Sequence, residues 1–340
     1  MPASCNPAAK VDQIFNVVTA ARPLEIETRP LSNSGVSLPR VALGCGNFGG
    51  IGSSLDWVGR GMSDDEAMAV MDAAWELGLT HFDTADAYGA GNSERAIGSW
   101  IASRGIRPTL TTKTFNPMAE GADSGLGADR IARQFQTSLE RLGVDHVELY
   151  LAHDYDPDTP LVETLGAFDR LMDAGSIDAY GVSNFNAQQL ERARAAGDPV
   201  AIQNGYSLLE RGDEAEVIAQ CAAHGIAYTV FSPLCGGWLT GKYGRGAQFP
   251  SGSRMTQRPE PYEHLMNEWT FDALDALRAF GDGRGTSMAG VALAWLLADE
   301  RIGQVVIGPG RPAHLEPLRE ALQRPLTPTE RDQVGVIFQR

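Results

Sequence analysis

Short β-branched runs alternate with amphipathic helical stretches from about residue 39 onward, and this alternation constrains the fold more than any other feature of the chain. Each such pair is a βα unit, and repeated βα units build a parallel sheet. The strand candidates number eight: 40–44, 80–83, 109–113, 146–152, 179–182, 201–203, 227–231 and 305–307.

Helical periodicity fills the intervals between these strands. Ser63 is a good N-cap, and Glu66 stands three residues later at the capping-box position, ahead of an apolar stretch over 67–77. Glycines at 78, 143 and 175 follow three of the helical patterns, where a left-handed residue usually ends a helix. The other helical patterns are 93–102, 128–142, 161–174, 187–195, 213–224 and 288–297.

Eight strands, each followed by a helix with no break in composition, favour one closed (β/α)₈ TIM barrel over a doubly wound sheet. Residues 1–22 are interpreted as an N-terminal extension and 23–340 as the barrel domain. Extended pieces at 24–28 and 35–37 predict a hairpin that closes the bottom of the barrel. The long segments 46–61 and 239–263 follow strands, so they are expected on the catalytic face as lids or substrate walls.

The charge of the chain narrows its partners. It carries 28 Lys and Arg against 43 Asp and Glu, a formal charge of 28 − 43 = −15, with no basic run. Such a chain lacks the surface that neutralises phosphates and is repelled by anionic membranes, so neither nucleic acid nor a membrane is an expected partner.

Four scattered cysteines without C-x-x-C spacing predict neither disulfides nor a metal site. The apolar stretch 14–21 is too short and polar for a signal segment, so a cytoplasmic location is predicted.

Four polar side chains fall at strand ends, where barrel enzymes carry their chemistry. Asp83 ends the second strand, Tyr88 follows five residues later, Lys113 ends the third strand and His153 follows the fourth. A lysine ammonium makes a tyrosine anion less unfavourable, and a carboxylate keeps that lysine charged and oriented. With His153 as a hydrogen-bond donor, Tyr88 could polarise a carbonyl group.

The sequence around these residues resembles the aldo-keto reductases of the long-chain bacterial type. Within that family it resembles the aldehyde and sugar reductases and the members that are like potassium-channel β subunits. The similarity runs from about 38 to 325. Seven motifs occur in order: 78–89 with Asn92-Ser93-Glu94, Lys113 after a strand, Tyr150-Leu151-Ala152-His153, Gly181-Val182-Ser183-Asn184-Phe185, Gln203-Asn204, Phe231-Ser232-Pro233-Leu234 with Gly241-Lys242-Tyr243, and Val306-Ile307-Gly308.

The resemblance implies roles for these positions. Asp83, Tyr88, Lys113 and His153 match the family's catalytic residues, with Tyr88 as general acid or base toward a carbonyl or alcohol substrate. A nicotinamide cofactor would be held without a Gly-x-Gly-x-x-Gly turn. The expected cofactor-binding residues are Ser183, Asn184 and Gln203 at the nicotinamide carboxamide, Phe231 stacked on the ring, Ser232 and Leu234 along the ribose and pyrophosphate, and Gly236, Lys242, Gly308 and Arg311 around the rest.

One departure bears on which cofactor is used. The family often has an arginine two residues after the glycine that follows strand eight, close to the 2′-phosphate of NADP. Here Gly310 takes that position, Arg311 is displaced by one residue, and His314 replaces a glutamine. Arg311 could still turn onto a 2′-phosphate. NADP is therefore favoured modestly, and NAD is the alternative.

Aromatic residues of the catalytic-face loops are the candidate substrate contacts, with loop packing as the alternative for each: Phe48, Trp57, Phe115 and Trp238. Arg60 and Arg254 lie on the same loops, but exposed arginines are usually solvated, so no anionic substrate is inferred from them. The expected partner is a small carbonyl or alcohol compound, such as an aldehyde, ketone, sugar, or steroid-like or terpenoid alcohol. No particular oligomeric state is predicted.

Two other functions compete with this interpretation. A non-catalytic, nucleotide-sensing subunit of the same fold would keep the same residues. An unrelated barrel enzyme acting on a sugar phosphate would need a phosphate cradle, for which only the glycines at 236–237 and 308–310 qualify. The order of the motifs argues against this second alternative.

Overall fold

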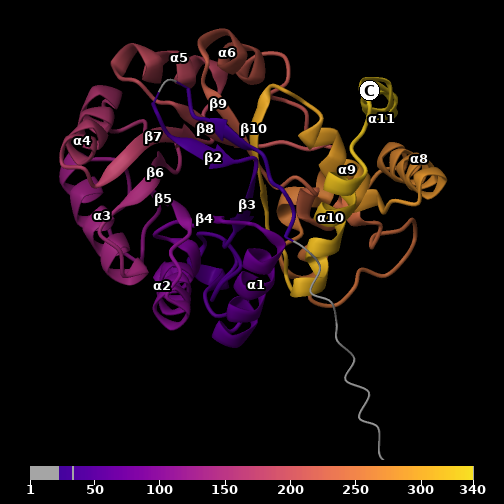
Figure 1. Ribbon diagram of the computed structural model, residues 1–340, viewed down its shortest axis with the longest axis horizontal. Coiled ribbons are helices and arrows are strands. Elements are labelled where there is room, and N and C mark those ends of the chain that lie inside the picture. Colours follow the sequence, from indigo (N-terminus) through magenta and orange to yellow (C-terminus); the bar gives the residue numbers. More distant parts are fainter. Residues whose placement is uncertain (1–22, 33, 340) are drawn as a thin grey trace, which may run out of the picture.

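The computed structural model describes residues 23–32 and 34–339, and eight parallel strands of this part of the chain close into a barrel (Figure 1). Around the barrel the order is β10-β3-β4-β5-β6-β7-β8-β9, so each strand pairs with its neighbours along the chain and the last strand closes on the first. The strands are β3 Val41–Gly44, β4 His81–Asp83, β5 Thr109–Thr114, β6 Val147–Ala152, β7 Ile177–Ser183, β8 Ala201–Gly205, β9 Ala227–Phe231 and β10 Ile302–Ile307.

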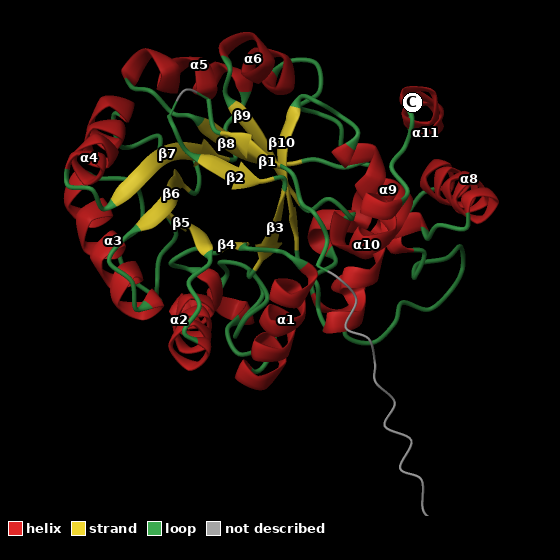
Figure 2. Ribbon diagram, in the orientation of Figure 1, coloured by secondary structure: helices red, strands yellow, loops and turns green. Residues whose placement is uncertain are grey.

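Helices surround the barrel as an outer layer (Figure 2). Buried apolar side chains of the strands and helices form one large core between the two layers. The α-helices are α1 Asp64–Leu77, α2 Asn92–Arg104, α3 Ala128–Leu142, α4 Leu161–Asp173, α5 Ala187–Ala196, α6 Val217–His224, α7 Arg254–Gln257, α8 Glu268–Arg284, α9 Met288–Leu297, α10 Glu316–Gln323 and α11 Pro328–Ile337. Short 3₁₀ turns are η1 Leu55–Trp57, η2 Tyr88–Gly91, η3 Cys235–Thr240, η4 Glu260–Leu265 and η5 Pro312–Leu315.

Local sequence signals set the ends of these helices. The expected capping box is present at α1, where the Ser63 side chain accepts from the Glu66 N–H and the Glu66 carboxylate accepts from the Ser63 N–H. Gly78 ends α1 with φ 103° and Gly143 ends α3 with φ 67°. Both values lie in the left-handed region, which favours glycine, so the chain turns back toward the next strand there.

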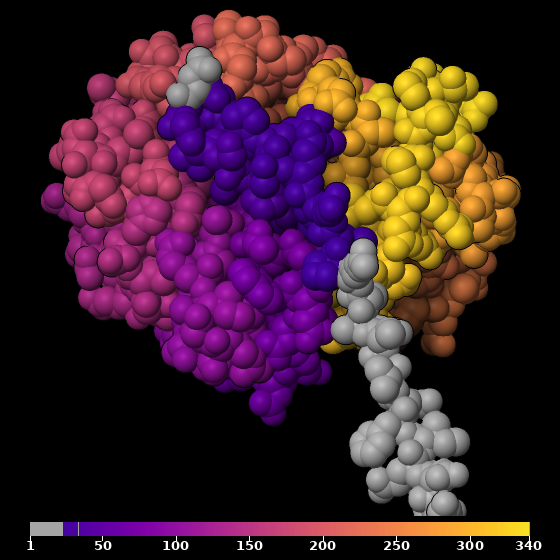
Figure 3. Space-filling view, in the orientation of Figure 1, coloured from indigo at the N-terminus to yellow at the C-terminus, as the bar shows by residue number. Residues whose placement is uncertain are grey.

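The predicted hairpin closes one end of the barrel. β1 Thr28–Pro30 pairs antiparallel with β2 Ser37–Pro39, and the indigo chain of this region lies across the middle of the face shown in Figure 3. Leu31 and Leu38 pack there in a small cluster of their own with residues of β6, β7 and β8. Because this end is covered, the strand ends at the opposite face carry the accessible polar groups.

The structure departs from the sequence prediction in a few places. α6 begins at Val217, four residues after the predicted start at 213, and α8, α10 and α11 were not among the predicted helices. α8 and α11 contact each other on the outside, where they extend the helical layer next to α9 (Figure 1). The predicted extension 1–22 lies outside the described residues. Within the described part, no helix is long and apolar enough to cross a membrane, and no three possible ligand side chains cluster around a metal position.

Candidate active site

The four candidate catalytic residues come from three neighbouring strands and the turn after one of them. Asp83 is the last residue of β4, Lys113 lies near the end of β5, and His153 directly follows β6. Tyr88 begins η2, in the turn that follows β4. Because carboxyl ends of parallel strands meet at one rim, residues 70 positions apart in the chain face one another.

Lys113 and Asp83 form an ion pair inside the barrel. The Lys113 Nζ donates to Asp83 Oδ1 at 2.6 Å and to the Thr84 carbonyl at 2.8 Å, and the lysine side chain has no exposed surface. Burial works against the ammonium charge, but the adjacent Asp83 carboxylate and Tyr88 hydroxyl outweigh it and raise the pKa of Lys113. Lys113 is therefore a fixed positive charge beneath the site.

The Tyr88 hydroxyl lies within hydrogen-bond reach of this ammonium. The Lys113 Nζ is also 5.1 Å from the centre of the tyrosine ring. Burial raises the pKa of Tyr88, and the Lys113 charge opposes this rise without cancelling it. The hydroxyl therefore keeps its proton at neutral pH, and the ammonium stabilises any negative charge that develops on its oxygen.

His153 lies beside Tyr88, with ring centres 5.4 Å apart and ring planes 78° apart. Burial, assisted by the Lys113 charge, lowers the pKa of His153 to about 3, so the imidazole is neutral. The Asn116 side-chain nitrogen is 3.5 Å from His153 Nδ1. If that amide donates to Nδ1, the remaining imidazole proton lies on Nε2, from which it can be donated to a ligand oxygen.

The loop after β3 packs tightly against the Tyr88 turn. Gly46 lies against the Tyr88 ring, where an added Cβ atom would be 3.5 Å from the ring. An added Cβ atom at Gly50 would lie 2.6 Å from the Gly89 Cα atom, and the Gly89 N–H donates to the Gly52 carbonyl at 3.2 Å. The first part of the predicted lid segment 46–61 is thus a close-packed support for Tyr88.

Replacing Gly50 with alanine is expected to lower the free energy of unfolding by about 1–3 kcal/mol, because the new methyl group overlaps backbone atoms. The Cβ atom is fixed by the backbone and meets only backbone atoms, so no rotamer change relieves the contact. Gly212→Ala is the matched control, because no atom of the described residues lies within 4 Å of its added Cβ atom. Urea unfolding of both variants measures the difference, and equal stabilities would contradict this packing argument.

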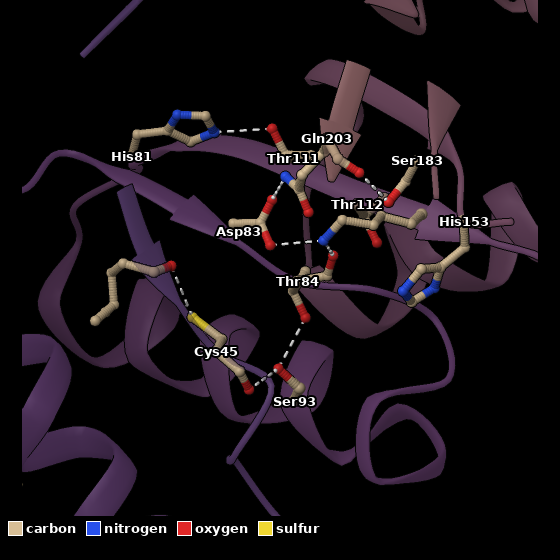
Figure 4. Close-up of polar contacts among 12 residues, drawn as sticks. Cys45, His81, Asp83, Thr84, Ser93, Thr111, Thr112, His153, Ser183 and Gln203 are labelled. Atoms are coloured by element: carbon tan, nitrogen blue, oxygen red, sulfur yellow. Dashed lines mark hydrogen bonds and ion pairs between the residues drawn. The ribbon is translucent and has the colours of Figure 1, made fainter. Parts of the chain in front are cut away.

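A second set of polar groups continues from Asp83 to β7 and β8 (Figure 4). The Gln203 side-chain amide donates to Asp83 Oδ2 at 2.8 Å, and the Ser183 hydroxyl donates to the Gln203 carbonyl at 2.6 Å. Asn184 has a φ of 61° and donates its side-chain amide to the His153 carbonyl at 2.9 Å. Gln203 and Asn184 therefore connect directly to the catalytic candidates, and Ser183 connects to them through Gln203.

The chain after β9 folds into a tight turn at the same rim. Ser232 has a φ of 55°, a rare value for a residue with a side chain, and it is in hydrogen-bond contact with the Tyr262 hydroxyl. Gly236 lies against the Tyr262 ring and Gly237 against the Lys242 side chain, and an added Cβ atom would be 2.4 Å from each. Backbone strain of this kind gathers at ligand sites.

Phe231 and Leu234 flank this turn and are half-buried. The Phe231 ring covers Gly205 at the end of β8, where an added Cβ atom would be 3.3 Å away. Its place at the end of a barrel strand is consistent with the ring-stacking role that the sequence predicts.

Exposed cations gather on one side of this turn. The Arg311 Nε donates to His314 Nε2 at 3.0 Å, and burial together with the charges of Arg311 and Lys242 lowers the pKa of His314. Within the described residues, neither Lys242 nor Arg311 has a carboxylate within ion-pair distance. Gly308 directly follows β10. Among the described residues, only two atoms lie within 4 Å of the position of an added Cβ atom there, so the space beside it is open. The donor set suits an anionic group of a dinucleotide.

Arg254 is a functional candidate that the sequence interpretation left as a solvated residue. In the structure Arg254 is half-buried on the catalytic face, and its Nη2 donates to the Asn47 side-chain oxygen. Asn47 in turn lies 4.0 Å from the position of an added Cβ atom at Gly308. Burial lowers the pKa of Arg254, but an arginine stays charged. The sequence signal was an arginine inside a long catalytic-face loop, with no acidic residue within five positions of it.

Comparison with known proteins places the chain in a family. The Aldo/keto reductase family model matches residues 41–336. The chain belongs to the aldo/keto reductase family. An uncharacterized oxidoreductase of Bacillus subtilis is 34% identical over 86% of this chain and 89% of that protein. A probable voltage-gated potassium channel subunit beta of Arabidopsis thaliana is 31% identical over 83% of this chain and 91% of that protein.

Solved structures agree with this assignment. The glycerol dehydrogenase of Gluconobacter oxydans superposes with a TM-score of 0.77 and 27% identity, over 91% of this chain and 94% of that one. The resemblance to this family and the barrel fold are therefore both confirmed, and the chain is an oxidoreductase by family.

The aromatic residues expected at the substrate pocket divide into two pairs in this aldo/keto reductase. Trp57 and Phe115 are half-buried on the catalytic face, and the Arg60 guanidinium lies 5.0 Å from the centre of the Trp57 ring. Phe48 and Trp238 depart from the prediction, because both are 0% exposed. Trp238 packs among Tyr243, Phe249 and Phe271, and Phe48 belongs to the main core, so neither ring presents surface to a substrate. Loop residues can be core residues where a long loop folds over itself.

Proposed function

We propose that this chain is an NADP-dependent aldo-keto reductase that interconverts a small carbonyl compound and its alcohol, with NAD as the alternative cofactor. The observation that supports this most is the arrangement at one rim of a protonated tyrosine, a buried Lys113–Asp83 pair and a neutral histidine. A bound nicotinamide would supply or accept the hydride.

The protein's own contribution is to orient the substrate oxygen and move one proton. Tyr88 Oη would donate its proton to the carbonyl oxygen during reduction, and Lys113 Nζ stabilises the charge left on Tyr88 Oη. His153 Nε2–H would hold the same oxygen as a hydrogen-bond donor. Asp83 keeps Lys113 oriented through the 2.6 Å contact. In alcohol oxidation the same proton moves in reverse.

The residues present fit a nicotinamide dinucleotide. Ser183, Asn184 and Gln203 supply amide and hydroxyl groups next to Asp83 and His153. The turn after β9 contains Ser232 and Gly236, both with positive φ, and Phe231 and Leu234 flank it. Beyond the turn lie Lys242, Gly308 and Arg311. Arg254 adds a half-buried cation on the same face. Although the chain has a charge of −15, Lys242, Arg254 and Arg311 have no carboxylate within ion-pair distance among the described residues, so their charges are free for an anionic cofactor.

Titration with NADPH and NADH, followed by protein fluorescence, tests cofactor binding directly. A panel of aldehydes, ketones and sugars, with the corresponding alcohols, is then screened with the tighter cofactor. We expect saturable NADPH binding and cofactor oxidation with at least one carbonyl. The relative named as a potassium channel subunit favours a nucleotide-sensing role as the second candidate. Tight binding without turnover on any carbonyl would support that role and contradict ours.

Replacing both Lys242 and Arg311 with alanine is expected to weaken NADPH binding about 10-fold or more. NADH binding should stay within about twofold of the wild type. The reason is that charge-assisted contacts to a phosphate contribute about 1.5–3 kcal/mol each when formed. Both side chains are exposed and have no carboxylate within ion-pair distance in the described part of the chain, so the fold should be unaffected. Fluorescence titration measures both dissociation constants.

Arg60→Ala is the control for this double variant, because Arg60 is also exposed and has no carboxylate partner among the described residues. It lies in the loop after β3, where its guanidinium packs on the Trp57 ring. Equal losses of NADPH and NADH affinity in the double variant would show that the two cations do not distinguish the cofactors.

A further inference from the structure

A buried polar layer lies behind the candidate active site, between β5 and the helices α2 and α3. Lys113 points into the barrel, so its neighbours Thr112 and Thr114 point outward. The Thr112 hydroxyl donates to Glu94 Oε1 at 2.7 Å, and the Thr114 hydroxyl donates to Asp86 Oδ2 at 2.6 Å. All four residues are fully buried, with an exposed fraction of 0%.

Arg130 of α3 fixes the direction of the second of these hydrogen bonds. Its Nη1 donates to Thr114 Oγ1 at 2.9 Å, so the hydroxyl proton is left for Asp86. Arg130 itself is anchored by the Gly125 and Asn116 carbonyls at 3.0 and 2.7 Å. A relay from Arg130 through Thr114 to Asp86 therefore lies in the core, fully oriented.

The backbone of Asp86 is held at the same place. Its N–H donates to the Lys113 carbonyl at 3.0 Å, and its carbonyl accepts from Arg141 Nη1 at 3.4 Å. The Asp86 carboxylate also accepts from the Ala87 N–H, one residue before Tyr88. Asp86 thus ties the turn that carries Tyr88 to the strand that carries Lys113.

We propose that Asp86 is a positioning residue for the proposed reaction, which holds the Tyr88 hydroxyl in register with the Lys113 ammonium through Thr114 and Arg130. The inference rests on the proposed function, since it assigns Asp86 to the proton transfer at Tyr88. Asp86 touches neither the substrate position nor the groups expected to hold the cofactor, so its effect should be on turnover.

The surroundings of Asp86 make it an unfavourable residue for stability alone. Burial raises the pKa of Asp86 to about 7, and Glu94 on α2 adds to this rise. Arg130 on α3 opposes it. Arg141 on the same helix donates to the Asp86 carbonyl and forms an ion pair with Glu94 at 3.1 Å. Tyr150 on β6 faces the carboxylate, and Asp86 Oδ1 has no hydrogen-bond partner among the described residues.

The sign of the pH effect follows from this. Asp86 has a pKa of about 7 in the folded chain and 3.8 in the unfolded chain, so the folded chain binds this proton more tightly. The contribution of Asp86 to the free energy of unfolding therefore falls as the pH rises from about 4 to about 7. An asparagine at position 86 does not ionise, so it would not cause this loss of stability. A carboxylate kept here at the expense of stability is typical of a functional residue.

Asp86→Asn and Thr114→Val test the proposal, with Thr112→Val as the matched control on the same strand. A shift of a reacting group by 1 Å lowers a rate by about 100-fold, so we expect kcat to fall about 10-fold or more in the first two variants. KM and the NADPH dissociation constant should stay within about twofold of the wild type, and Thr112→Val should keep wild-type kcat. Asp86→Asn should also raise the melting temperature at pH 8.

The pH profile separates positioning from a purely structural role. Wild-type kcat should rise between pH 6 and 8 as ionised Asp86 strengthens its hydrogen bonds, and Asp86→Asn should lack this rise. If Asp86→Asn keeps the wild-type kcat and pH profile, the inference is overturned while the proposed function stands. Equal losses of kcat in Thr112→Val and Thr114→Val would have the same meaning. Absence of turnover in the wild type would overturn the proposed function, and the inference with it.

Discussion

Tyr88→Phe is expected to lower kcat for carbonyl reduction about 1,000-fold, because the variant removes the proton donor and nothing else. The phenyl ring keeps the contacts with His153 and Gly46, so the turn should hold its shape. The burial and charges around the hydroxyl keep it protonated at neutral pH, which makes it the proton source for the substrate oxygen. Steady-state kinetics with the best carbonyl substrate measures the loss.

Cofactor binding provides the internal check on this variant. The NADPH dissociation constant should change less than about twofold, because the expected cofactor contacts come from the ends of β7 and β8 and from the chain after β9 and β10. Tyr155→Phe is the control: its ring packs at 5.3 Å on Phe185 just beyond His153, and kcat should stay at the wild-type value. Turnover by Tyr88→Phe within tenfold of the wild type would mean that another group supplies the proton.

The periodic pattern of the sequence was sufficient for the barrel. Each of the eight predicted strands overlaps an observed one, because a strand buried on both faces leaves a short β-branched run that is easy to recognise. The capping box at Ser63 and Glu66 likewise carries its signal within four residues. By contrast, α8 follows no strand directly and packs on α9 and α11, so the βα rhythm does not predict it.

The candidate site was predictable where its residues sit at strand ends. Asp83, Lys113 and His153 needed only the strand assignments to be placed at one rim. The second hydrogen bond of Asp83, from Gln203 120 residues away, and the half-burial of Arg254 depend on how loops and strands meet in space. No local pattern carries that information. The same reason explains Phe48 and Trp238, whose loop positions suggested exposure although their rings are buried.

Lys113→Met should reduce both stability and turnover more than any surface change. The variant leaves the Asp83 carboxylate buried at 2% exposure without its ammonium, and breaking a buried pair in this way lowers the free energy of unfolding by about 3–5 kcal/mol. Turnover should fall about 1,000-fold, because the charge that stabilises the Tyr88 anion is lost. Chemical unfolding and steady-state kinetics measure the two effects.

The double variant Lys113→Met/Asp83→Asn separates these effects. Asparagine removes the unpaired charge while it keeps an oxygen that can accept from Gln203, so most of the lost stability should return. Turnover should stay as low as in Lys113→Met, because neutrality at position 83 does nothing for the charge on Tyr88 Oη. If stability and turnover recover together, the ammonium acts only by holding the fold. If stability alone recovers, its role is electrostatic, which is the outcome that the contact of Lys113 with Tyr88 predicts.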